Sequence, residues 1–269
     1  MKKRPIGIID VSCDGLSVVT TLLKEYKNED ILYFNDIKNL PYEGKDSLVI
    51  LKYIKKNVEY LLSQDIKLLV VVSDTIIEYG NEFLETLEVP VISIVQTLID
   101  YVNKNYENKN MILCAKDYII KANLYQKNIK YSHLVTVNSN KLEEIILGNK
   151  IKTMKSFNAS LDTFKAHQSR DFDVLLYTAP WIELVKTEIL EFLKVKDFIK
   201  LGDIIASSVG LKLSSPYKKG AGKLFIHSTV SYEDFKNMTL WFKEKYKYTQ
   251  AVIDYDQNRT IQKDNWWIK

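Results

Sequence analysis

Short continuous apolar runs alternate with longer stretches of helical spacing along the first part of this chain. The runs have the length of strands and lie at residues 6–9, 31–34, 68–72 and 91–95. The stretches between them repeat apolar positions every three or four residues, at 16–26, 47–63 and 76–87. Continuous apolar runs are typical of buried parallel strands, and the longer spacing is typical of amphipathic helices. The pattern therefore predicts a parallel sheet built by right-handed crossovers.

The same alternation restarts in the second part of the chain. Strands are expected at 111–114, 134–137, 174–176, 198–201 and 223–227. Helices are expected at 119–127, 142–164 (interrupted by Gly148), 182–193, 206–213 and 232–245, followed by a short aromatic tail. Two such halves predict an α/β fold with two doubly wound domains.

Polar residues follow one strongly apolar strand in each half. The strand at 68–72 ends in Ser73, Asp74 and Thr75, and the strand at 174–176 ends in Tyr177 and Thr178. Open α/β sheets bind ligands outside the carboxyl ends of their strands. We therefore expect both strand ends to face one inter-domain cleft.

Composition restricts the function classes further. The 269 residues are 46% hydrophobic with a net charge of +4, and the basic runs are short and scattered. Solvated surfaces explain such runs better than a nucleic-acid interface does. The apolar runs are far shorter than the roughly 20 residues of a membrane span, and the first run, at 6–9, is too short for a signal peptide. We expect a soluble, cytoplasmic protein without membrane insertion.

Cysteine and histidine are too few and too dispersed for a disulfide framework or a metal centre. Cys13 and Cys114 are the two cysteines, and the three histidines show no ligand spacing. The sequence therefore predicts no metal and no cofactor.

Four short motifs, in order along the chain, resemble those of glutamate racemase in the aspartate/glutamate racemase superfamily. Residues 10–17 read DVSCDGLS where that family has DSGxGGLS, and residues 33–36 and 41–43 read YFND and PYE for YFGD and PYG. Residues 73–75 read SDT for CNT, and residues 176–181 read LYTAPW for GCTHYP. By analogy with the family, residues 1–96 plus 207–269 form the first domain and residues 97–206 form the second.

The resemblance implies racemisation by two cysteine bases on opposite faces of the substrate. A thiolate with a lowered pKa removes the α-proton, and a second thiol returns one. Here the base positions are Ser73 and Tyr177, and the family histidine beside the second base is Ala179. A serine hydroxyl is a far weaker acid than a thiol and cannot become the required anion unaided.

The substrate-binding positions implied by the resemblance are also altered. Val11 replaces a serine, and Asp74 and Glu43 place negative charges where an anionic amino acid would lie. In the second half, residues 115–119 (AKDYI) lack the hydroxyls of the family segment ATxxT. The family residues that remain are Asp10, Pro41, Tyr42, Thr75 and Thr178.

Several of these residues also have structural interpretations. Asp10 has three alternative interpretations, as a residual base, as a substrate contact or as a helix cap. Thr75 and Thr178 are interpreted either as retained family residues or as helix caps. Cys13 and Cys114 are interpreted either as a new pair of thiol bases, in place of the two family cysteines, or as small buried apolar residues. Lys116 is a partner for Asp14, Asp74 or Glu43, in a plugged site or a site for a cationic ligand. Trp266 and Trp267 are packed on the body or anchor a partner chain.

We therefore predict a catalytically inactive glutamate racemase-like protein, a pseudoenzyme retained for binding, structure or assembly. The alternative is an isomerase that acts on glutamate or a related substrate with other bases, such as Asp10, Cys13 or Tyr177. A third hypothesis is a scaffold that polymerises through its surface. The resemblance implies a homodimer and leaves a protein partner or a small-molecule ligand open.

Overall fold

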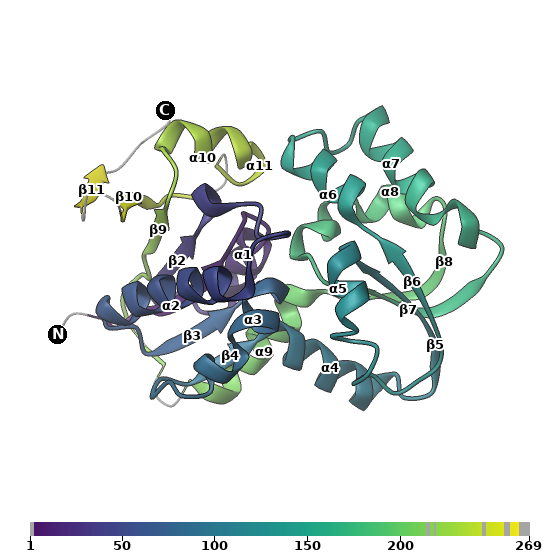
Figure 1. Cartoon of the computed structure of the whole chain (residues 1–269), viewed down its shortest axis with the longest axis horizontal. Coiled ribbons are helices and arrows are strands. Elements are labelled where there is room, and N and C mark those ends of the chain that lie inside the picture. Colours follow the sequence, from purple (N-terminus) through teal and green to yellow (C-terminus); the bar gives the residue numbers. More distant parts are fainter. Residues whose placement is uncertain (1–2, 214–215, 218, 244–245, 256–258, 264–269) are drawn as a thin grey trace. The chain divides into compact units, whose positions relative to one another are not determined.

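The computed structural model describes residues 3–213, 216–217, 219–243, 246–255 and 259–263 (Figure 1). The chain divides into two compact units. Unit 1 comprises Met1–Ile94 and Ile205–Lys269, and unit 2 comprises Val95–Ile204. Trp266 and Trp267, which are predicted to pack on the body or to anchor a partner chain, lie outside the described residues.

Unit 1 is built on a sheet with the strand order β11-β10-β9-β2-β1-β3-β4. Its strands are β1 Ile6–Asp10, β2 Ile31–Asn35, β3 Leu68–Val71, β4 Val91–Ser93, β9 Leu224–Ser228, β10 Thr249–Asp254 and β11 Arg259–Lys263. Neighbouring strands are parallel except for the antiparallel pair β10 and β11. Every residue of β1, β2 and β3 is buried, which explains their continuous apolar runs.

The helices of unit 1 connect these strands. They are α1 Leu16–Glu25, η1 Ile37–Asn39, α2 Ser47–Ser63, α3 Asp74–Leu84, α10 Tyr232–Met238 and α11 Leu240–Lys243, together with most of α9 Leu201–Lys212. Asp46 caps α2, because its side chain accepts a hydrogen bond from the backbone N–H of Leu48. Gly15 precedes α1 at a close approach, since a Cβ there would lie 2.4 Å from Val72 Cγ2.

Unit 2 contains a fully parallel sheet with the order β6-β5-β7-β8. Its strands are β5 Lys109–Ala115, β6 Tyr131–Asn138, β7 Asp171–Tyr177 and β8 Lys194–Phe198. Its helices are α5 Asp117–Ala122, α6 Asn140–Leu147, α7 Met154–Phe164, η2 Lys165–His167, η3 Pro180–Val185 and α8 Lys186–Leu190, with α4 Ile94–Asn105 at the entry to the unit. The two parallel sheets confirm the predicted α/β fold class.

Several predicted elements differ in the structure. The helix expected over 232–245 is the two helices α10 and α11, and the helix expected over 119–127 ends at Ala122. The strand expected at 91–95 ends at Ser93, and α4 follows it directly. The expected helix over 142–164 is two helices, because Asn149 and Lys152 adopt positive φ and Thr153 begins α7 with a capping box. The expected helix over 182–193 is the 3-10 turn η3 followed by the short α8. The strand expected at 198–201 is β8, which ends at Phe198 and has exposed or half-buried residues throughout.

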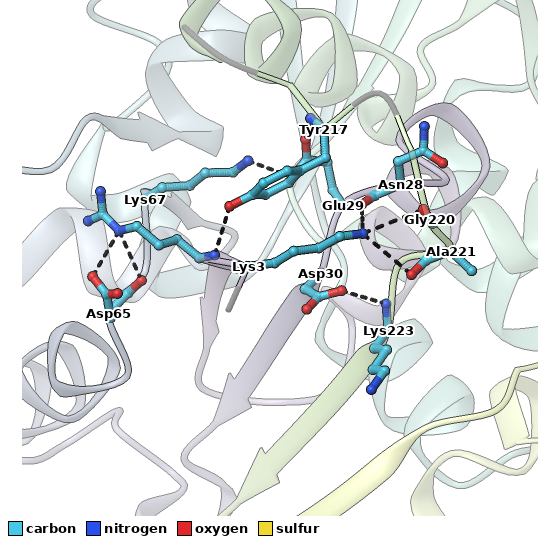
Figure 2. A network of polar contacts seen from close by, with 11 residues as sticks. Lys3, Asn28, Glu29, Asp30, Asp65, Lys67, Tyr217, Gly220, Ala221 and Lys223 are labelled. Atoms are coloured by element: carbon cyan, nitrogen blue, oxygen red, sulfur yellow. Dashed lines mark hydrogen bonds and ion pairs between the residues drawn. The ribbon is translucent and has the colours of Figure 1, made fainter. Parts of the chain in front are cut away.

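A polar network at the amino ends of the strands joins the two chain segments of unit 1 (Figure 2). Lys67 Nζ lies 2.5 Å from Glu29 Oε2, and the two side chains are 14% and 2% exposed. The backbone N–H of Tyr217 donates to Glu29 Oε1 at 2.7 Å, and Lys67 Nζ lies 4.2 Å from the centre of the Tyr217 ring. A buried carboxylate thus binds both a lysine of the first segment and the backbone of the second.

Within the described residues, no helix combines the length and the apolar character that a membrane span requires.

Candidate functional site

The carboxyl ends of β1, β2 and β3 bring the first group of predicted site residues together. Asp10 pairs with Asn35 of β2, and Ile9 pairs with Val71 of β3, so the residues that follow each strand lie at one edge of the sheet. The Val72 N–H donates to Ile9 O at 3.1 Å, which continues the pairing one residue further. Val11 and Ser73, which follow the neighbouring strands β1 and β3, therefore lie at the same edge of the sheet.

Asp10 is almost fully buried and its carboxylate accepts three hydrogen bonds. Oδ1 accepts from the Ser12 N–H at 3.0 Å, and Oδ2 accepts from the Gly15 N–H at 2.9 Å and the Tyr33 hydroxyl at 2.7 Å. One of these donors is the backbone N–H of Gly15, the N-cap residue of α1, although no side chain makes an N-capping bond to the free N–H groups of this helix. Asp10 thus stabilises the turn that leads into α1, and its role as a base or a substrate contact stays a prediction.

Ser73, Asp74 and Thr75 form the start of α3. Ser73 is the N-cap residue, is 7% exposed and makes no side-chain capping bond. Asp74 is the first helical residue, where the helix dipole stabilises a negative charge. Thr75 is buried in the first turn of α3. The alternative prediction that Thr75 caps this helix is wrong, because Ser73 is the N-cap residue.

Pro41, Tyr42 and Glu43 lie in the loop between η1 and α2, after a cis Leu40–Pro41 bond. Pro41 and Glu43 are exposed, and Tyr42 is buried. The Tyr42 hydroxyl donates to Asp36 Oδ2 at 2.7 Å. Asp36 is fully buried, and it also accepts from Asn39 Nδ2 and from Asn57 Nδ2, each at 2.9 Å.

Asp36 is the last residue of the YFND motif, for which the sequence predicted no separate role. Its position directly after β2 was the available signal, because acidic residues at the carboxyl ends of parallel strands often serve a site. The structure makes it the residue to which the loop of Pro41 and Tyr42 is anchored.

Cys13 is fully buried in the turn between β1 and α1. Burial raises the pKa of its thiol, and the nearby carboxylates of Asp10 and Asp14 raise it further. Asn35 Nδ2 lies 3.7 Å from Cys13 Sγ. A reactive cysteine needs an accessible, electropositive environment, and this one is buried and acidic.

The second predicted base position, Tyr177, ends β7 in unit 2 and is fully buried. Its hydroxyl accepts a hydrogen bond from the Leu201 N–H at 3.4 Å, and its ring lies 5.0 Å from that of Phe198. Burial, followed by the negative charge of Glu183, raises the pKa of Tyr177 well above its ordinary value. Tyr177 therefore stays protonated near neutral pH.

The other predicted residues of unit 2 lie at the same carboxyl edge as Tyr177. Thr178 and Ala179 are buried directly after β7, and Ala179 rather than Thr178 is the N-cap residue of η3. Lys116 follows β5, and its Nζ lies 3.7 Å from Glu143 Oε2. The sequence did not identify Glu143 as a partner of Lys116.

Cys114 and Glu143 are buried in the same part of unit 2. Ser139 donates a hydrogen bond from its hydroxyl to Glu143. Burial raises the pKa of the Cys114 thiol, and the Glu143 carboxylate adds to this effect. Neither cysteine has the lowered pKa that proton abstraction from an amino acid requires.

No group of three or more His, Cys, Asp or Glu side chains in the described part of the chain is arranged to hold a metal ion.

No protein-family model matches the chain, but its sequence is similar to those of known glutamate racemases. Glutamate racemase of Hydrogenobaculum sp. is 23% identical over 257 residues, covering 93% of this chain and 92% of that protein. Glutamate racemase of Staphylococcus aureus is 30% identical over 128 residues, covering 47% of this chain and 48% of that protein.

Solved structures of this superfamily share the fold. Glutamate racemase of Thermus thermophilus, in complex with β-chloro-D-alanine, has a TM-score of 0.84 at 18% identity, covering 95% of this chain and 98% of that one. The Francisella tularensis enzyme, in complex with D-glutamate, has a TM-score of 0.79 at 18% identity, covering 96% and 100%. Aspartate racemase of Picrophilus torridus has a TM-score of 0.55 at 15% identity, covering 77% and 94%.

Proposed function

We propose that this chain, which is glutamate racemase-like in sequence and fold, is a pseudoenzyme retained for a binding or assembly role. The observation that carries the proposal is the state of the two positions where the resemblance calls for thiolate bases. One holds Ser73, and the other holds Tyr177, which is buried, protonated and hydrogen-bonded to the backbone.

The chemistry of proton abstraction supports this proposal. The α-proton of an amino acid is very weakly acidic, so its removal needs an anionic base within hydrogen-bond reach. A serine hydroxyl serves as such a base only when a neighbouring base activates it. A tyrosine with a raised pKa also fails as a base at neutral pH, because almost none of it is ionised.

The alternative isomerase with non-standard bases receives less support. It needs Cys13 or Tyr177 as a base, and both are fully buried with raised pKa values. Its remaining candidate, Asp10, has its carboxylate engaged by three donors.

The binding role we propose lies at the carboxyl edge of unit 1, around the loop of Pro41, Tyr42 and Glu43. Glu43 and Asp74 add negative charge beside this edge and so disfavour a dicarboxylate such as glutamate. An amino acid without a side-chain carboxylate, or a cationic ligand, suits this charge better. The setting we propose is a homodimer, which the resemblance implies, in the cytoplasm, which the composition predicts.

A racemisation assay tests the proposal. The purified full-length chain is incubated with L-glutamate or D-glutamate, and the enantiomers are separated by chiral chromatography. We expect conversion no faster than in buffer, while the Thermus thermophilus enzyme serves as the positive control. Conversion above the buffer rate would overturn the proposal, and its loss in Asp10→Asn, Cys13→Ala, Ser73→Ala or Tyr177→Phe would identify the base.

A further inference from the structure

The loop that carries Pro41 and Tyr42 is bound to the carboxyl-terminal part of unit 1 by two separate sets of contacts. The first is a line of hydrogen bonds through the buried carboxylate of Asp36. Tyr255, directly after β10, donates from its hydroxyl to Asn57 Oδ1 at 3.0 Å. Asn57, on α2, donates to Asp36 Oδ2, which also accepts from the Tyr42 hydroxyl.

The second set of contacts runs through Lys38 of η1. The Lys38 backbone N–H donates to Thr229 Oγ1, directly after β9, at 3.0 Å. Lys38 Nζ lies 3.9 Å from Asp254 Oδ1, the last residue of β10. Both sets therefore join residues 36–42 to the carboxyl ends of β9 and β10.

Tyr255 is itself held in place from two directions. Lys56 Nζ lies 4.2 Å from the centre of the Tyr255 ring, and the Tyr60 ring packs edge-on against it with centroids 6.4 Å apart. Burial raises the pKa of Tyr255, and the Asp36 carboxylate is the next largest cause. The phenol is thus a fixed, protonated donor beside a buried negative charge.

Buried polar networks are sensitive to the loss of a single member. Removing one donor leaves its buried acceptor without a partner, which costs more than the hydrogen bond alone contributes. If Tyr255 loses its hydroxyl, Asn57 Oδ1 loses this donor, and Asn57 is the residue that connects α2 to Asp36.

We propose that Tyr255 is a positioning residue for the ligand-binding loop, which it orders through Asn57 and Asp36 with Lys38 as a parallel support. The carboxyl-terminal strand β10 thereby controls how well the loop of Tyr42 is formed. This inference rests on the proposed function only in that it takes the loop to be the binding element.

Backbone hydrogen exchange tests the inference without any ligand. The Leu40 N–H donates to Ile37 O and the Lys45 N–H to Tyr42 O, so exchange at these amides reports the closed loop. In Tyr255→Phe we expect exchange at residues 37–46 to accelerate roughly fivefold or more relative to the amides of α3 in the same sample.

Tyr26→Phe is the matched control. It removes a tyrosine hydroxyl of the same unit, which donates to Ala206 O at 2.6 Å and makes no contact with the loop among the bonds described. We expect this variant to leave exchange at residues 37–46 unchanged relative to α3.

Lys38→Gln provides a second variant in case Tyr255→Phe does not fold. It removes the ion pair with Asp254 and keeps the backbone bond to Thr229, so we expect a smaller acceleration confined to the same residues. Equal exchange at 37–46 in the wild type and in a folded Tyr255→Phe, or in Lys38→Gln where the first variant does not fold, would overturn the inference. Since no ligand is used, that outcome would leave the proposed function standing. A failure of the proposed function would likewise leave the exchange result intact.

Discussion

The Tyr177 hydroxyl lies 3.4 Å from the backbone nitrogen of Leu201 and accepts a hydrogen bond from it inside unit 2. The position that the resemblance assigns to a proton-transferring thiol thus holds a side chain that binds the first residue of α9. Free backbone N–H groups at a helix start need an acceptor. Tyr177 supplies one, which is a structural role.

We expect Tyr177→Phe to destabilise the protein without changing any reaction. The substitution leaves the Leu201 N–H without this acceptor in a buried environment, at a cost of about 1 kcal/mol. Urea unfolding followed by circular dichroism measures the change. An unchanged midpoint would show that water replaces the hydroxyl at no cost, and would contradict the structural role.

The two cysteines are expected to be unreactive in the folded protein. Cys13 and Cys114 are fully buried with raised pKa values, so neither presents a thiolate to a reagent. A disulfide reagent should modify both roughly a hundredfold or more slowly in buffer than in denaturing urea, because reaction needs opening of the structure. Fast modification of one thiol in the native protein would revive the alternative of a cysteine base.

Stability is expected to fall as the pH drops from about 6.5 towards 4. Burial lowers the pKa of His227 from 6.5 to about 4, and its Nδ1 lies 2.8 Å from the Tyr60 hydroxyl. The unfolded chain takes up this proton first, so the contribution of neutral His227 is complete above the unfolded pKa and is lost as the pH falls through the folded pKa. A depression of this size corresponds to roughly 3 kcal/mol.

Chemical denaturation at a series of pH values measures this dependence. His227→Gln should flatten the curve between pH 6.5 and 4, whereas His133→Gln, at an exposed position, should leave it unchanged. An equal slope in the wild type and in His227→Gln would assign the pH dependence to other groups.

The ion pair between Glu29 and Lys67 should be costly to break. In Lys67→Met the carboxylate of Glu29 stays buried without its cation, which destabilises a protein by about 3 kcal/mol. The double variant Glu29→Gln with Lys67→Met should recover part of this loss. Lys141→Met removes an exposed pair with Asp162 and serves as a control, for which no measurable change is expected. A Lys67→Met variant as stable as the wild type would show that the buried carboxylate of Glu29 does not depend on this ion pair.

Fully buried strands could be predicted from the sequence, whereas some partly exposed strands could not. The strands β1, β2 and β3 are buried along their whole length, so their apolar runs are unbroken and their positions could be predicted. β8 lies at a sheet edge with the pattern KVKDF, and its apolar content is too low to mark a strand. β10 and β11 lie in the segment predicted only as an aromatic tail.

The candidate site was predictable to a similar degree. That Asp10, Val11 and Ser73 share one edge follows from parallel topology, which the sequence pattern predicts. The anchoring of Tyr42 by Asp36 was not predictable from the sequence. Asn57 and Tyr255, which complete this network, lie 21 and 219 residues after Asp36, and no local pattern indicates contacts over such separations. Whether Cys13 is buried also depends on packing, which neither its spacing nor its neighbours in sequence reveal.

Solvent-deuterium exchange at the α-carbon of L-glutamate and D-glutamate, followed by NMR, tests the central claim most directly. It detects proton abstraction by even a single base, which a racemisation assay would miss. Loss of function at both base positions predicts no deuterium incorporation beyond that in buffer over many hours at neutral pH. Incorporation above the buffer rate would show that a working base survives and would contradict the assignment as a pseudoenzyme, and substitution of Asp10, Cys13, Ser73 and Tyr177 in turn would show which residue it is.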